Sequence, residues 1–136
     1  MTALALVTAN RVEVVEALIQ MTLVAGEAIP AGQAVRIDGT TGKFTKANGT
    51  IAAEARMYGV AAHTVVAGEA LTAIRKGVMD GIDISALAYD AAVYLSDTDG
   101  TLADAAGTVS VVVGRVIPGT SVTLGTSPDK LLFVDL

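Results

Sequence analysis

The chain has 136 residues, which is enough for one domain with a buried core of its own. Apolar residues make up 52% of it and charged residues only 17%, against roughly 25% in soluble domains, so part of the surface is expected to be covered by a partner or by other copies. The net charge is −5, the nine basic residues are scattered and there is no cysteine, which argues against nucleic-acid binding and excludes thiol catalysis, cysteine-ligated metals and disulfides.

The first eleven residues are predicted to form an extended N-terminal arm, ahead of a single β domain over residues 12–136. The opening segment MTALALVTAN is uncharged and apolar, and it precedes the first clear strand. It lacks the basic n-region and the longer apolar run of a signal peptide, so we expect a protein made without an export signal. The alternative is that this segment frays, or forms a first strand within the domain.

Short runs of Val, Ile, Leu and Thr between glycine-containing turns predict a mostly β chain. In chain order the expected strands are Arg11–Val15, Ala34–Ile37, Lys43–Lys46, Ala92–Ser96, Val109–Val113 and Leu131–Val134. Ala17–Met21 is also assigned to a strand because it lies between valine-rich runs. Two short helices are expected, at Ala52–Met57 with Thr50 as the N-cap and in one turn at Ser85–Ala88. The predicted fold is a compact small β barrel with one or two short helices.

Two internal repeats accompany this pattern. VAGEA occurs at residues 24–28 and again at 66–70. In each copy we expect the glycine to permit a strand-exit turn, the glutamate to face solvent, and Ile29 or Leu71 to return to the core. The segment AVRIDGTTGKFTKA also aligns with AVYLSDTDGTLADA, and both predict a hairpin because Asp-Gly and Gly accept the positive φ of tight turns.

No residue pattern points to catalysis or to a metal site. His63 is the only histidine and lies in an apolar run, which is typical of a half-buried structural residue. In LSDTDGTLAD a calcium-loop register places Leu95 and Ala106 where oxygen ligands are needed. Lys76 lacks the neighbours of a lipoyl or biotin carrier lysine, and no serine lies in a G-x-S-x-G motif. We expect no enzyme, no cofactor, no metal and no small-molecule substrate. The uncharged stretches are also too short for a membrane span of roughly 18–20 residues.

A series of short segments in a fixed order spans roughly residues 20–118. They are AGEAIPAGQAV, the hairpin IDGTTGKFTKA, YGVA, AGEAL, GVMDG, and VYLSDTDG followed by VGRVI. In order and spacing they resemble the small head-decoration, or capsid cement, proteins of tailed bacteriophages. The resemblance implies a β-tulip or β-clip-like barrel that forms a homotrimer on the exterior of a phage capsid and clamps neighbouring subunits of the major capsid protein. It also implies a virion protein made in the host cytoplasm, with no catalytic residue to carry over.

Under this resemblance, the arm is expected to anchor the protein by adding as a strand to a sheet edge of the capsid. The candidate capsid-binding residues are Leu4, Leu6, Val7 and Arg11. VAGEAIPAGQAV also resembles the start of β-clip modules that bind carbohydrates, so a carbohydrate- or receptor-binding module is the alternative. Sugar sites usually offer aromatic platforms, and the chain has only three tyrosines, two phenylalanines and no tryptophan. The acidic balance fits the outside of a shell better than a DNA-facing inside.

Overall fold

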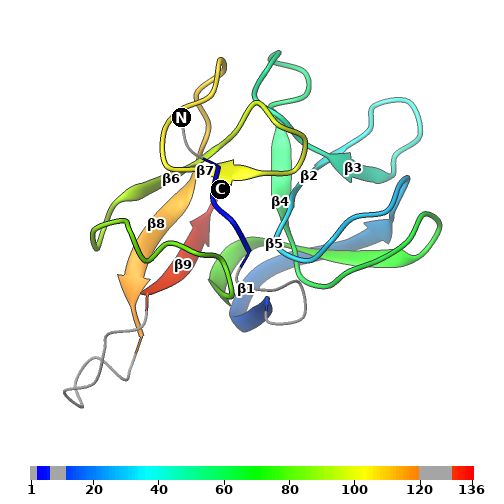
Figure 1. Cartoon of the computed structure of the whole chain (residues 1–136). Helices are drawn as coiled ribbons and strands as arrows, with labels where there is room; N and C mark the ends of the chain where they lie inside the picture. Colours follow the sequence, from blue (N-terminus) through cyan, green and yellow to red (C-terminus); the bar gives the residue numbers. More distant parts are fainter. Residues whose placement is uncertain (1–2, 7–11, 120–129) are drawn as a thin grey trace.

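The computed structural model describes residues 3–6, 12–119 and 130–136. Within these ranges the chain forms nine strands and no helix (Figure 1). The strands are β1 (Glu13–Val24), β2 (Ala34–Ile37), β3 (Phe44–Lys46), β4 (Met57–Ala61), β5 (Ala70–Asp80), β6 (Ala92–Leu95), β7 (Leu102–Ala103), β8 (Val112–Pro118) and β9 (Lys130–Asp135). The prediction of a mostly β fold is confirmed.

The strands belong to one antiparallel sheet that curls into an open half-barrel (Figure 1). Along the sheet the order is β3-β2-β4-β5-β9-β8-β6-β7, and β1 pairs with β5 outside this path. Strand β5 is central, because one of its edges pairs with β1 along its whole length while its other edge pairs first with β4 and then with β9. Among the described strands β1 pairs only with β5, which makes it a twelve-residue edge strand.

Two clusters of apolar side chains fill the interior. The larger one contains Ile74 of β5 together with Leu132 and Val134 of β9, all without exposed surface. The smaller one is built around Phe44 and Ile29. Buried and less buried residues alternate along β9, the period of two expected for a sheet that is covered on one face.

The two predicted hairpins are confirmed. In the first, β2 pairs with β3 and Ile37 lies opposite Phe44. In the second, β6 pairs with β7 and Leu95 lies opposite Leu102. The segment Ala17–Met21, assigned to a strand from its flanking valines, lies within β1.

The predicted short helices are wrong, because residues 52–55 and 85–87 form turns and bends, and Met57 already belongs to β4. In the first segment Ala55 N donates to the carbonyl of Ile51, but the chain then enters β4 before a second helical turn can follow. Thr50 does not act as an N-cap in the structure. Its backbone N–H and its hydroxyl both donate to the side-chain oxygen of Asn48.

The two VAGEA segments lie beside each other and pair. Ala25 N donates to the carbonyl of Glu69, and Gly68 N donates to the carbonyl of Ala25, each at 2.8 Å. Ile29 and Leu71 are fully buried, as expected. The first copy ends β1, but the second forms the turn that leads into β5, so the expectation of a strand-exit turn is wrong for the second copy.

The glutamates of both segments accept hydrogen bonds from backbone N–H groups. Glu27 is half-buried, and its carboxylate accepts hydrogen bonds from the Thr45 hydroxyl and from Lys46 N. Glu69 is exposed, and its Oε1 accepts from Val66 N at 2.8 Å. The expected solvent-facing position is therefore wrong for Glu27 and correct for Glu69, although both carboxylates brace a turn.

Candidate functional site

The predicted capsid-binding residues are only partly placed by the structure, since Val7 and Arg11 lie outside the described residues. Leu4 and Leu6 are half-buried and pack against the larger core cluster. Leu4 N donates to the carbonyl of Leu102 at 2.8 Å, and Leu6 forms an isolated bridge to the segment that follows β5. An arm that binds a capsid through these two leucines would first have to leave those contacts.

Strand β1 exposes a row of apolar side chains along the edge of the sheet. Half of the ten large apolar residues that are exposed in the described chain lie on it, with exposed fractions between 39 and 56%: Val15, Leu18, Ile19, Met21 and Val24. Its two charged residues, Glu13 and Glu16, are also exposed. A long, exposed and hydrophobic edge strand is a template for pairing with another chain. We call this surface the β1 edge.

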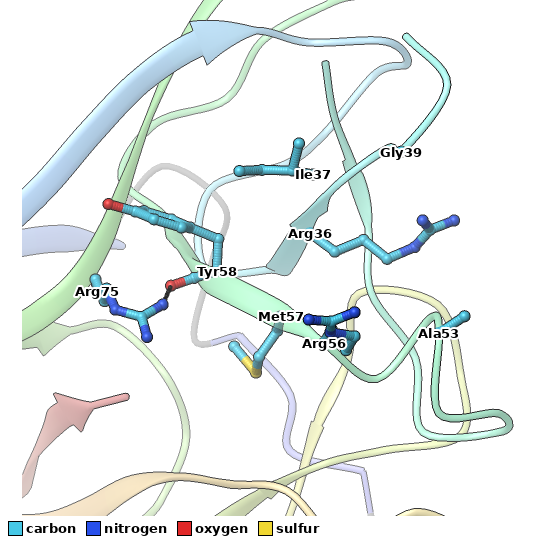
Figure 2. A pocket seen from close by; sticks show the side chains of 8 residues that line it. All are labelled: Arg36, Ile37, Gly39, Ala53, Arg56, Met57, Tyr58 and Arg75. Atoms are coloured by element: carbon cyan, nitrogen blue, oxygen red, sulfur yellow. Dashed lines mark hydrogen bonds between the residues drawn. The ribbon is translucent and has the colours of Figure 1, made fainter. Parts of the chain in front are cut away.

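A second surface is an open hollow of about 680 Å³ beside β2 and β4 (Figure 2). Strand β2 contributes Arg36, the turn before β4 contributes Arg56, and β5 contributes Arg75. The complete lining is Arg36, Ile37, Gly39, Ala53, Arg56, Met57, Tyr58 and Arg75. We call it the arginine pocket, because three of the five arginines of the sequence meet there in an acidic chain.

The positive charge of the arginine pocket has no carboxylate among the described residues that line it. Arg75 donates to the backbone carbonyl of Tyr58 at 3.2 Å, and its guanidinium lies 5.2 Å from the centre of the Tyr58 ring. Arg36 Nε is shielded from solvent and has no hydrogen-bond partner in the described structure. Figure 2 shows Arg36 and Arg56 on one side of the hollow and Arg75 with Tyr58 on the other. Unpaired guanidinium groups at one site favour binding of an anion.

Asp38, which follows β2, is held by its own turn rather than by the arginine pocket. Its Oδ1 accepts hydrogen bonds from Thr40 N at 2.8 Å and from Thr41 N at 3.2 Å. These two N–H groups lower the pKa of Asp38, and the charge of Arg36 adds a smaller lowering. Asp38 therefore leaves the positive charge of Arg36 without a bonded counterion.

The other chemically interesting residues have structural roles. His63 Nε2 accepts from Thr72 N at 3.2 Å, Asp97 accepts from Thr108, and Asp99 accepts from the Asn48 amide at 2.6 Å. Among the residues that the structure describes, no three His, Asp or Glu side chains gather as a metal site requires. The described part of the chain also contains no helix that is long and apolar enough to cross a membrane.

Sequence reasoning misses the arginine pocket because its three arginines are about 20 positions apart from one to the next. Only Arg75 has a basic neighbour, Lys76, and one such pair does not mark a patch. Only the lateral order β2-β4-β5 brings them together. No family model, curated protein or solved structure matches the chain.

Proposed function

We propose that this chain is a structural virion protein that binds the outer surface of a phage capsid and cements the shell by clamping neighbouring subunits of the major capsid protein. In this proposal the half-barrel is a β-tulip or β-clip-like domain, and the functional unit is a homotrimer on the capsid exterior. The protein is made in the host cytoplasm and is not an enzyme. It uses no cofactor, nucleic acid, membrane or small-molecule substrate.

The observation that carries the proposal is the β1 edge. A strand of twelve residues that leaves Leu18 and Val15 more than half exposed is an aggregation hazard in an isolated monomer. In a protein built for assembly the same strand is covered by its neighbours. The low content of charged residues, 17% of the chain, agrees with a surface that is covered in use.

The carbohydrate-binding alternative finds less support in the structure. Sugar sites use exposed aromatic rings as platforms, and the aromatic ring of the arginine pocket is already engaged. Tyr58 packs against Phe44 with the ring centres 5.8 Å apart, and the guanidinium of Arg75 lies over the same ring. This ring is therefore in use within the chain.

The test is binding of the isolated protein to heads of the phage that encodes it, prepared without this chain. We expect saturable co-sedimentation and a higher temperature of head disruption when the protein is present. Heads that neither bind the protein nor gain stability would contradict the proposal. Binding to a glycan array in the same preparation would instead support the carbohydrate-binding module.

A further inference from the structure

The charged residues of the β1 edge and of the arginine pocket are complementary. Glu13 and Glu16 are exposed, and neither carboxylate has a hydrogen-bond or ion-pair partner among the described residues. The other carboxylates mostly do have partners, as Asp90 does with Arg115 and Asp135 with Lys76. Two acids without a partner among the described residues thus lie on β1, and three arginines without a carboxylate partner among the described residues meet in the pocket.

These two surfaces belong to opposite sides of β5. Ile74 pairs with Gln20 of β1 on one edge and with Val60 of β4 on the other, and the arginine pocket lies on the β4 side. Glu13 and Glu16 lie on the strand at one edge of β5, are opposite Asp80 and Val78, and are not among the residues that line the pocket. The carboxylates of the β1 edge therefore leave the pocket of their own chain open to a second copy.

We propose that the arginine pocket receives Glu13 and Glu16 from the β1 edge of a second copy of this chain, so that each copy contributes its β1 edge to one neighbour and its pocket to another. The inference rests on the proposed function for the homo-oligomer and adds the residues that join it. Because the two surfaces differ, the contact is head-to-tail, and the proposed homotrimer is the ring that forms when a three-fold rotation relates neighbouring copies.

The chemistry of the pocket suits this occupant. A guanidinium presents a planar fork of donors that matches a carboxylate. Arg56 is exposed and its guanidinium has no hydrogen-bond partner among the described residues, so its donors are open to an incoming carboxylate. Ile37, which is 43% exposed, lies in the lining beside Arg36 and offers an apolar contact for Val15, the neighbour of Glu16. The contact therefore pairs charge with charge and apolar surface with apolar surface.

The experiment measures self-association of the isolated full-length protein by native mass spectrometry and sedimentation equilibrium. The variants are Glu13→Arg/Glu16→Arg, Arg56→Glu, and a swap that combines Glu13→Arg, Glu16→Arg, Arg36→Glu and Arg56→Glu. Arg56 is exposed and makes no hydrogen bond in the described structure, so its replacement leaves the fold intact. Lys43→Glu, an equal change of charge at an exposed residue outside the arginine pocket, is the matched control.

We expect Glu13→Arg/Glu16→Arg and Arg56→Glu each to raise the dissociation constant by about 100-fold or more, because like charges across an interface are strongly unfavourable. Lys43→Glu should leave it unchanged. The swapped variant should recover assembly to within about tenfold of the wild type, since each contact is again between opposite charges. If the swap does not fold by circular dichroism, the comparison of Arg56→Glu with Lys43→Glu decides alone.

Three results would overturn the inference. The Arg56→Glu variant could assemble as strongly as the wild type, the wild type could be a monomer, or the swapped variant could fold and still be a monomer. The outcome is separate from that of the head-binding experiment, because no capsid is present. If the protein binds heads but its self-association does not change in the charge variants, only this contact is refuted. If self-association depends on these charges but the protein does not bind heads, the proposed function is refuted and the contact stands.

Discussion

Leu18, in the middle of β1, is the residue at which assembly and folding can be separated most cleanly. It is 56% exposed in the isolated chain, whereas Leu132 in β9 has no exposed surface. Full burial of a leucine side chain contributes about 1.5–3 kcal/mol, so slightly more than half of this, about 0.8–1.7 kcal/mol, remains to be gained when a second chain covers β1. Leu18→Lys removes this gain and adds the cost of burying an ammonium group at the interface.

We expect Leu18→Lys to unfold within about 0.5 kcal/mol of the wild type in urea, as exposed substitutions usually do, and to lose self-association by at least tenfold. Leu132→Ala should do the opposite and cost about 2–5 kcal/mol of folding stability through the cavity it leaves. Val66→Lys is the matched control, because Val66 is 60% exposed and lies outside β1. Sedimentation equilibrium and urea denaturation give the two readouts. Unchanged association of Leu18→Lys, or an equal loss in Val66→Lys, would refute the assignment of β1 as an interface.

Four further outcomes are expected. Gly68→Ala should lower the free energy of unfolding in urea by about 1–2 kcal/mol, because Gly68 has a φ of 90°. Gly26→Ala is the control and should change it by less than about 0.5 kcal/mol, because the added Cβ would come no closer than 3.4 Å to Phe44. Equal losses in the two variants would show that φ is not the cause. The pKa of Asp38 is lowered in the fold, so its carboxylate contributes stability above about pH 4 that is lost as the pH falls through the lowered pKa. In thermal melts over a series of pH values, Asp38→Asn should therefore lose less stability on acidification than the wild type does. Deletion of residues 2–10 should abolish co-sedimentation with heads and also lower folding stability, because Leu4 and Leu6 pack on the larger core cluster. Undiminished binding by a deletion variant that is folded by circular dichroism would show that the arm is not the anchor. Glu27→Gln should barely change assembly by native mass spectrometry, because an amide oxygen can still accept from the β3 backbone; a large loss would give the charge itself a functional role.

The hairpins are predictable because their turn chemistry is local. Asp38 accepts from N–H groups two and three residues on, and Gly42 and Gly100 adopt φ values of 72° and 71° that other residues rarely tolerate. Both properties are visible in a few neighbouring letters of the sequence. The first hairpin has the strand Ala34–Ile37 at the predicted bounds for the same reason.

The longer strands are predictable only in part, because each contains a glycine that lies against the backbone of a strand distant in sequence. A Cβ on Gly77 of β5 would lie 2.3 Å from the carbonyl oxygen of Glu16, and one on Gly114 of β8 would lie 1.9 Å from that of Phe133. These glycines allow close approach of an adjacent strand and do not end their own strand. The sequence contains the glycine but not the strand beside it, so β5 is missed and β8 is expected to stop at Val113.

The same limit applies to the candidate sites. The apolar residues Leu4 and Leu6 suit an arm and a core segment equally well, and only their contacts with the larger core cluster distinguish the two. The arginine pocket depends on the lateral order of β2, β4 and β5, which no local pattern encodes. The valine-rich sequence around Ala17–Met21, by contrast, predicts a strand correctly, although its exposure depends on its place at the sheet edge.

Electron cryomicroscopy of virions of the encoding phage, with and without the coding sequence of this chain, shows whether the protein decorates the capsid. We predict density of a small β trimer on the outer surface of the shell at three-fold and quasi-three-fold positions, and its loss in the deletion virions. Identical outer surfaces in the two reconstructions would contradict a role in capsid decoration.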